Sequence, residues 1–98
     1  MILIVWRYEV DPAHEGAFRA FYRPDGDWAR LFARGEGFLG LELGCEGEGS
    51  YVTIGRWRSA ADFDTCLGRF RGEYEAMDQC TTGWTRGEEF VGRYEQVE

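Results

Sequence analysis

Several residue types that serve as catalytic groups are missing or rare in this 98-residue sequence. All 11 basic residues are arginines, lysine and asparagine are absent, and His14 is the only histidine. A lysine Schiff base, an asparagine ligand and a histidine pair are therefore excluded. His14 lies in a polar stretch directly after Asp11 and Pro12, which is typical of a solvated surface histidine.

Arg7 is the first candidate for a catalytic residue. It follows Leu3 and Val5 on one face of a predicted strand, and it places a permanent cation at the end of an apolar row. Such a cation could bind a substrate anion and stabilise a developing oxyanion. The alternatives are an ion pair with Glu42 or Glu88 on a neighbouring strand, or simple exposure at the strand end.

Trp57 is the second candidate, because an indole can stack on an aromatic ligand. A tryptophan that closes a strand is also a common packing residue, so both interpretations stay open. The hydroxyls of Tyr22 and Tyr74 could hydrogen-bond a ligand, or they could reach water from a helix surface. Glu88 and Glu89 are adjacent on a predicted strand and face opposite ways, so they do not form a catalytic carboxylate pair.

The cysteines and the charge restrict the class of protein. Cys45, Cys66 and Cys80 are 21 and 14 residues apart and form no CxxC motif, so we expect free thiols in a reducing cytoplasm and no metal site. The net charge of −7 would repel nucleic acid. No segment approaches the roughly 20 apolar residues of a membrane span, and the short apolar run after Met1 lacks the features of a signal peptide. We expect a single domain over residues 1–98.

The elements that position these residues alternate between strand and helix patterns. Strands are predicted over 2–8, 38–45, 51–57 and 86–96, with a hairpin loop over 46–50. A first helix begins at Asp11-Pro12, is broken at Pro24 and resumes after Asp27. A second helix begins at Ser59 and continues to an exit loop over 80–83. We expect a local bend at Gly68 and Gly72, because glycine weakens a helix. The apolar stripe continues through them and consists of Phe63, Leu67, Phe70, Tyr74 and Met77.

This order is β-α-β-β-α-β, the ferredoxin-like arrangement of the α+β class, in which both helices cover one face of a four-stranded antiparallel sheet. The other face has no cover within the chain. The first strand is nevertheless apolar on both faces, at Leu3 and Val5 as well as at Ile2 and Ile4. We therefore expect a homodimer in which the open sheet faces of two copies pack together.

The sequence resembles the antibiotic biosynthesis monooxygenase group of the dimeric α/β-barrel superfamily over nearly its whole length. The segments that carry the resemblance are the apolar first strand with Asp11-Pro12 and Phe18, the run Gly-Phe-Leu-Gly-Leu-Glu-Leu over 37–43, and Tyr-Val-Thr-Ile-Gly-Arg-Trp-Arg-Ser over 51–59 followed by Asp62-Phe63.

The resemblance implies a small pocket between sheet and helices, in which some members oxygenate phenols without metal or flavin and others degrade haem. The haem-degrading members use Asn, His and Trp, so the absence of asparagine excludes that branch. The oxygenases use Asn, Trp, Tyr and Arg. Trp57 matches the expected Trp, whereas Phe63 stands near the place of a phenol, so the set is incomplete.

We therefore expect a cofactor-independent monooxygenase-like protein that binds a small aromatic or enolisable molecule in an apolar pocket. The alternative is a non-catalytic ligand-binding or structural dimer of the same fold. In either case the residues expected to line the pocket are Phe18, Tyr22, Trp57, Phe63 and Phe70.

Overall fold

The computed structural model describes residues 1–97, in which four antiparallel strands form one sheet in the order β2-β3-β1-β4. The strands are β1 (Ile2–Val10), β2 (Phe38–Gly47), β3 (Ser50–Trp57) and β4 (Thr85–Glu95). The helices are α1 (Glu15–Tyr22), α2 (Asp27–Phe32), α3 (Ala60–Arg69) and α4 (Arg71–Thr81). The predicted ferredoxin-like α+β order is confirmed, with each predicted helix divided in two.

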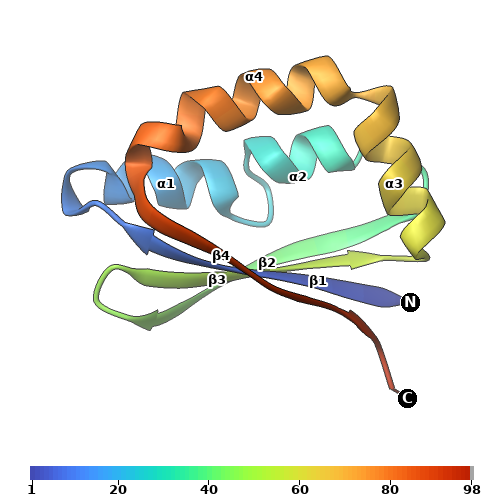
Figure 1. Cartoon of the computed structure of the whole chain (residues 1–98), viewed down its shortest axis with the longest axis horizontal. Helices are drawn as coiled ribbons and strands as arrows, with labels where there is room; N and C mark the ends of the chain where they lie inside the picture. The colour runs from blue at the N-terminus through green and yellow to red at the C-terminus, as the bar shows by residue number, and fades with distance from the viewer. Residues whose placement is uncertain (98) are drawn as a thin grey trace.

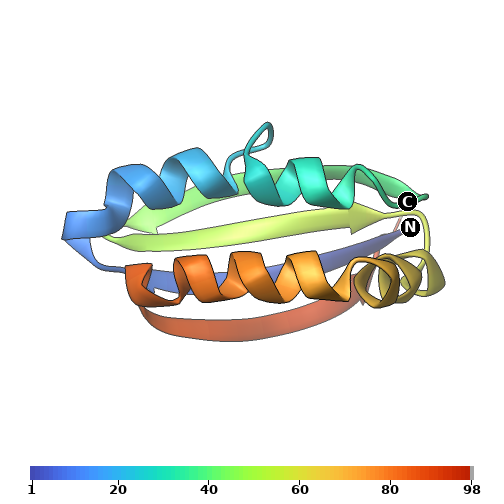
Figure 2. The ribbon, with the colours of Figure 1, turned by 90° about the horizontal axis from the view of Figure 1, so that it is seen from above.

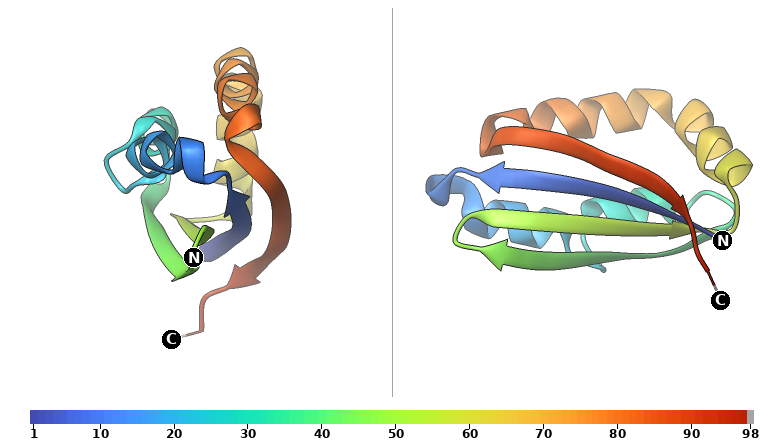
Figure 3. Two further views of the ribbon diagram at one scale, coloured as in Figure 1. Left: turned by 90° about the vertical axis from the view of Figure 1, so that its left-hand side faces the viewer. Right: turned by 60° about the horizontal axis from the view of Figure 1, so that its bottom comes forward.

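The helices of the described chain all lie on one face of the sheet (Figures 1 and 3). Seen from above, α1 and α2 follow one another in one row, and α4 lies beside them in a second row (Figure 2). The opposite face of the sheet carries no helix from residues 1–97, as predicted (Figure 3).

The break in the first helix falls at the predicted place. The Asp11 side chain accepts a hydrogen bond from the Ala13 N–H at 3.0 Å and caps a short 3-10 helix over Pro12–His14. The α1 helix then ends at Tyr22, before Pro24, and α2 begins at Asp27. Both helices bury aromatic side chains against the sheet.

The second helix is interrupted more sharply than the predicted bend at Gly68 and Gly72, and it ends later than predicted. The hydroxyl of Ser59 caps α3 by accepting from the Asp62 N–H at 3.1 Å, but the helix is interrupted at Phe70, where φ is −111° and ψ is 27°. The predicted exit loop over 80–83 is wrong, because α4 continues to Thr81 and a 3-10 helix follows. The hydroxyls of Thr81 and Thr82 donate to the Asp78 carbonyl and so satisfy an acceptor that the helix end leaves free.

A bulge at the start of β2 breaks the predicted alternation of leucines at Leu39. The register shifts between Phe38 and Gly40, and Gly40 takes a φ of +146° that favours glycine. The shift turns Phe38 toward the core and leaves Leu39 53% exposed, while Leu41 is buried. The following hairpin loop is shorter than predicted, because β2 extends to Gly47 and β3 begins at Ser50.

Alternation along β1 decides which side chains face the helices. Ile2, Ile4 and Tyr8 are buried in the core beneath the helices. Since successive strand residues point to opposite faces, Leu3, Val5 and Arg7 lie on the open face. The site therefore depends on the even-numbered residues of this strand.

Candidate functional site

A cavity of about 230 Å³ lies between the sheet and the helices. Its walls come from β1, β2, β3 and β4 on one side and from all four helices on the other. The lining residues are Ile4, Trp6, Tyr8, Tyr22, Trp28, Phe32, Leu41, Thr53, Gly55, Trp57, Phe63, Tyr74, Asp78 and Glu88.

Aromatic rings form a continuous series of contacts around this cavity. The centroid distances between successive rings are 5.1, 6.1, 5.8, 5.8 and 5.4 Å along the series Tyr8, Tyr22, Trp28, Phe32, Trp57 and Phe63. Tyr74 adds a further contact, 5.1 Å from the Trp28 ring. Because each ring restricts the next, the wall is held in place before any ligand arrives.

Two carboxylic acids stand at the exposed rim of the cavity. Asp78 is in the last turns of α4, and Glu88 is in β4 on the helix side of the sheet. Partial burial, and then the negative charge of Asp78, raise the pKa of Glu88 above its ordinary value. Within residues 1–97, the lining of this cavity includes no arginine and no histidine. The rim therefore suits proton acceptance and repels anions.

The tyrosines of the cavity remain neutral phenols. Burial raises the pKa of Tyr8 well above its usual range and that of Tyr22 to about 12, and it also raises the pKa of Tyr74. The contacts of Tyr22 with Thr81 and Trp28 oppose part of its shift. At neutral pH these hydroxyls can donate and accept hydrogen bonds without carrying charge.

The indole of Trp28 is part of the supporting wall. Trp28 is only 6% exposed, and its Nε1 has almost no accessible surface, so this atom does not face the open space of the cavity. Its hydrogen bond with the Tyr22 hydroxyl is one of the contacts that lower the pKa of Tyr22.

Three of the predicted lining residues reach the cavity, namely Tyr22, Trp57 and Phe63. Phe18 is fully buried behind it, with its ring stacked on Tyr22 at 4.1 Å. Phe70 lies at the break between α3 and α4, where the guanidinium groups of two arginines cover its ring. The structure therefore separates the predicted set into cavity wall and supporting core.

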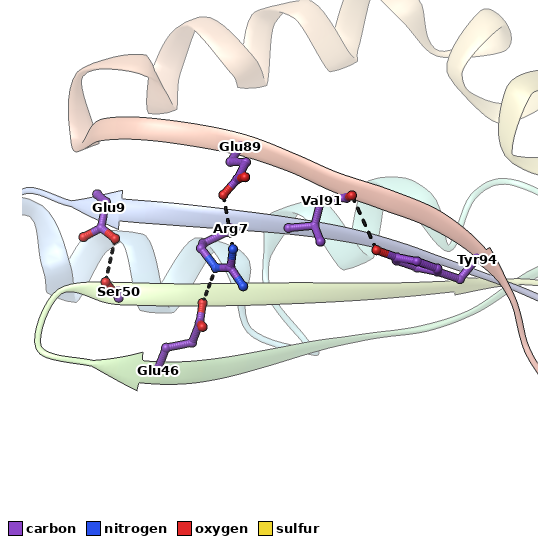
Figure 4. Close-up of polar contacts among 7 residues, drawn as sticks. All are labelled: Arg7, Glu9, Glu46, Ser50, Glu89, Val91 and Tyr94. Atoms are coloured by element: carbon purple, nitrogen blue, oxygen red, sulfur yellow. Dashed lines mark hydrogen bonds and ion pairs between the residues drawn. The ribbon is translucent and has the colours of Figure 1, made fainter.

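Arg7 lies on the opposite face of the sheet from Trp57 and the cavity. Its guanidinium group contacts Glu46 at 2.7 Å and Glu89 at 3.2 Å (Figure 4). The predicted ion pair is thus present, but both predicted partners are wrong. Glu42 pairs instead with Arg56, and Glu88 faces the cavity, because the β1 to β4 register sets Arg7 opposite Glu89.

Sequence reasoning missed the carboxyl pair at the rim. A signal for Asp78 was present, because it follows Tyr74 by four residues and so lies on the same helix face. The alternation of β1 likewise places Trp6 and Tyr8 on the face of Ile4. No comparable signal links Asp78 to Glu88, because only the docking of α4 brings them to one rim.

Residues 1–97 hold no group of three or more His, Cys, Asp or Glu side chains placed to bind a metal ion. None of its helices combines the length and the apolar character that crossing a membrane requires.

No protein-family model matches the sequence, and no curated protein is significantly similar to it. Solved structures are similar in fold. A variant of SnoaB, a cofactor-independent oxygenase from Streptomyces nogalater, is 22% identical with a TM-score of 0.79, over 99% of this chain and 93% of that one. A provisional antibiotic biosynthesis monooxygenase from Deinococcus radiodurans is 16% identical with a TM-score of 0.76, over 100% and 94% of the two chains.

A third structure, provisionally an antibiotic biosynthesis monooxygenase from Nitrosomonas europaea, is 12% identical with a TM-score of 0.73 and full coverage of both chains. Identities at this level establish the architecture and not the activity. The chain therefore has the ferredoxin-like fold of the antibiotic biosynthesis monooxygenase structures, as its resemblance to that group predicted.

Proposed function

We propose that this protein binds a small aromatic or enolisable molecule in the cavity and oxygenates it without a cofactor. The observation that carries this proposal is the aromatic cavity with Glu88, a carboxylate of raised pKa, at its rim. A general base works best when its pKa lies near the working pH, and the shift of Glu88 is in that direction.

The chemistry needs no outside reductant. Glu88 takes a proton from a phenol or from a carbon next to a carbonyl group, and the resulting electron-rich anion reduces dioxygen. In the net reaction a CH₂ group and O₂ give a carbonyl group and water, or a phenol with a free para carbon and O₂ give a quinone and water. In both cases the substrate supplies all four electrons. The neutral hydroxyls of Tyr8, Tyr22 and Tyr74 are the donors available to stabilise the anion, because Arg7 is on the other face.

The test is oxygen uptake with a panel of hydroquinones and an anthrone, without added metal. We expect uptake by the unaltered protein and a loss of at least about tenfold in Glu88→Gln, in keeping with the contribution of a general base. Glu89→Gln is the matched control, since Glu89 is its neighbour in β4 but pairs with Arg7 on the open face. Equal loss in both variants would contradict the assignment of Glu88.

A non-catalytic binding protein is the second candidate. The absence of asparagine favours this candidate, because the family resemblance implies that the oxygenases use an asparagine. Binding of the panel compounds without oxygen uptake would support this candidate and exclude turnover of those compounds.

We also propose that two copies pack through their open sheet faces. Val5, Val52 and Ile54 are only half-buried there, and the Tyr94 ring lies along the same face over Gly92 (Figure 4). The same face carries the ion pairs of Arg7 with Glu46 and Glu89, so the proposed self-complementary interface combines apolar and charged side chains.

Sedimentation should give about twice the 11.3 kDa chain mass at micromolar concentration. Ile54→Glu should shift the protein to monomer. Ala76→Glu adds the same charge on the exposed side of α4 and should leave the dimer intact. A monomeric unaltered protein would contradict the proposal.

The proposed location is a reducing cytoplasm. Its support is that Cys45, Cys66 and Cys80 form no disulfide in the described chain.

A further inference from the structure

We propose that Phe90 determines the ligand specificity of this cavity, by binding a planar apolar substituent that projects through the cavity mouth. The preferred ligand is then a phenol or enol whose ring carries an aryl group. This inference rests on the proposed function in placing the phenol or enol inside the cavity. It adds a binding residue that lies outside the cavity wall.

The mouth of the cavity lies between α4 and β4. Among the described side chains that line the cavity, the exposed ones are Asp78 of α4 and Glu88 of β4, whereas the others are buried or half-buried. Seen from above, β4 runs along the outer side of α4 as an edge strand of the sheet (Figure 2). A ligand that is longer than the cavity therefore leaves it between these two elements.

Phe90 stands beside this mouth. It follows Glu88 by two residues in the regular part of β4, so both side chains project from the same face of the strand, roughly 7 Å apart. The ring centroid of Phe90 lies 5.2 Å from that of Trp6, which lines the cavity. The aromatic wall thus continues from Trp6 to Phe90, beyond the lining itself.

A bulge in β4 gives Phe90 this position. The register with β1 shifts so that Gly92 is opposite Val5 and Phe90 is opposite Trp6, which leaves Val91 as the extra residue. Without it, Val91 would stand opposite Trp6. Bulges are common at sheet edges and beside active sites, where they redirect a side chain.

The exposure of Phe90 is the next observation. The residue is 51% exposed, although burial would stabilise a phenylalanine side chain. Its neighbour Trp6 is only half-buried, so the two rings form one continuous apolar surface that leads out of the cavity. Apolar surface of this kind is typical of a ligand-binding groove.

The size of the cavity fixes which part of the ligand reaches Phe90. The volume of about 230 Å³ is below the roughly 300–1,000 Å³ of pockets that enclose drug-sized ligands. A ring held beside Glu88 fills the inner part, and its substituent extends along β4 toward Phe90. An aryl group suits this place, because aromatic rings pack well edge-to-face or offset on one another.

The experiment compares hydroquinone with phenylhydroquinone by titration calorimetry under nitrogen, so that binding is measured without turnover. We expect the unaltered protein to bind phenylhydroquinone at least about tenfold more tightly, from the burial and the ring contacts of the phenyl group. Phe90→Ala should remove most of this preference and leave the affinity for hydroquinone unchanged. Phe90→Leu keeps an apolar side chain without a ring and should retain part of it.

Leu39→Ala is the matched control. Leu39 is exposed to a similar extent, 53%, and lies in β2, the edge strand on the other side of the sheet. This variant should leave both affinities unchanged. Equal losses for the two ligands in Phe90→Ala, no loss for phenylhydroquinone, or no binding of either ligand to the unaltered protein would overturn the inference.

Sedimentation tests the other possible cover for this ring, a second copy of the chain. We expect Phe90→Ala to sediment with the same mass as the unaltered protein. A lower mass would overturn the inference, because Phe90 would then belong to an interface between copies.

The two proposals fail separately. A phenyl preference that depends on Phe90, without oxygen uptake, supports this inference and contradicts the proposed oxygenase. Oxygen uptake that depends on Glu88, with no phenyl preference, does the reverse.

Discussion

Asp78 of α4 and Glu88 of β4 lie on the same rim of one cavity, and the charge of Asp78 adds to partial burial in raising the pKa of Glu88. Neither residue pairs with an arginine among the described side chains, in contrast to Glu89, which is bound to Arg7. Glu88 and Glu89 are thus neighbours in β4 with different environments, because Glu88 lies at the cavity rim and Glu89 is bound to Arg7 on the open face.

Asp78→Asn should lower the pKa of Glu88 toward its ordinary value, because the variant removes a neighbouring negative charge. The shift should be partial, since the contribution of burial stays. Titration of the Glu88 carboxyl carbon by NMR measures it, with Glu89→Gln as a control that leaves Glu88 unchanged. An unmoved pKa in Asp78→Asn would show that the two acids are not coupled.

Arg7→Ala should leave the affinity of cavity ligands and any oxygen uptake unchanged. The guanidinium group is on the open face, with Glu46 and Glu89 as its partners, so its removal does not reach the cavity. Calorimetry with the hydroquinone and anthrone panel measures the affinity, and oxygen uptake measures turnover, with Glu88→Gln as the comparison. A loss of uptake in Arg7→Ala as large as in Glu88→Gln would contradict the placement of the site.

Trp57→Ala should destabilise the fold by about 3–5 kcal/mol, the usual cost of deleting a buried large aromatic side chain. Trp57 is 1% exposed and packs edge-on against the rings of Phe32, Phe38 and Phe63. Urea denaturation measures the free energy of unfolding. Trp57→Phe keeps much of the packing and should cost less, and an equally large loss would point away from packing as the cause.

The free energy of unfolding should fall as the pH rises above about 10. The pKa of Tyr22 is about 12 in the folded chain against an ordinary value of 10.0, so the unfolded chain loses this proton first and is favoured at alkaline pH. Tyr8 and Tyr74 act in the same direction. Urea denaturation between pH 8.5 and 11 should show a smaller fall for Tyr22→Phe than for the unaltered protein, and identical falls would contradict the burial of this phenol.

Much of the fold follows from local patterns in the sequence. The alternation of β1, the break at Pro24 and the caps at Asp11 and Ser59 depend on residues within a few positions of one another. The bend expected from Gly68 and Gly72 is a full break at Phe70, and the bulge at Gly40 was not predicted.

The sequence by itself determined the ferredoxin-like order of elements, the face of β1 that carries Arg7 and the aromatic residues available for a cavity. Only the tertiary structure decided that Arg7 pairs with Glu46 and Glu89, and that Asp78 and Glu88 share one rim beside Trp28. The physical reason is that strand register and helix docking join residues far apart in the chain, and neither is encoded in the spacing of any one segment.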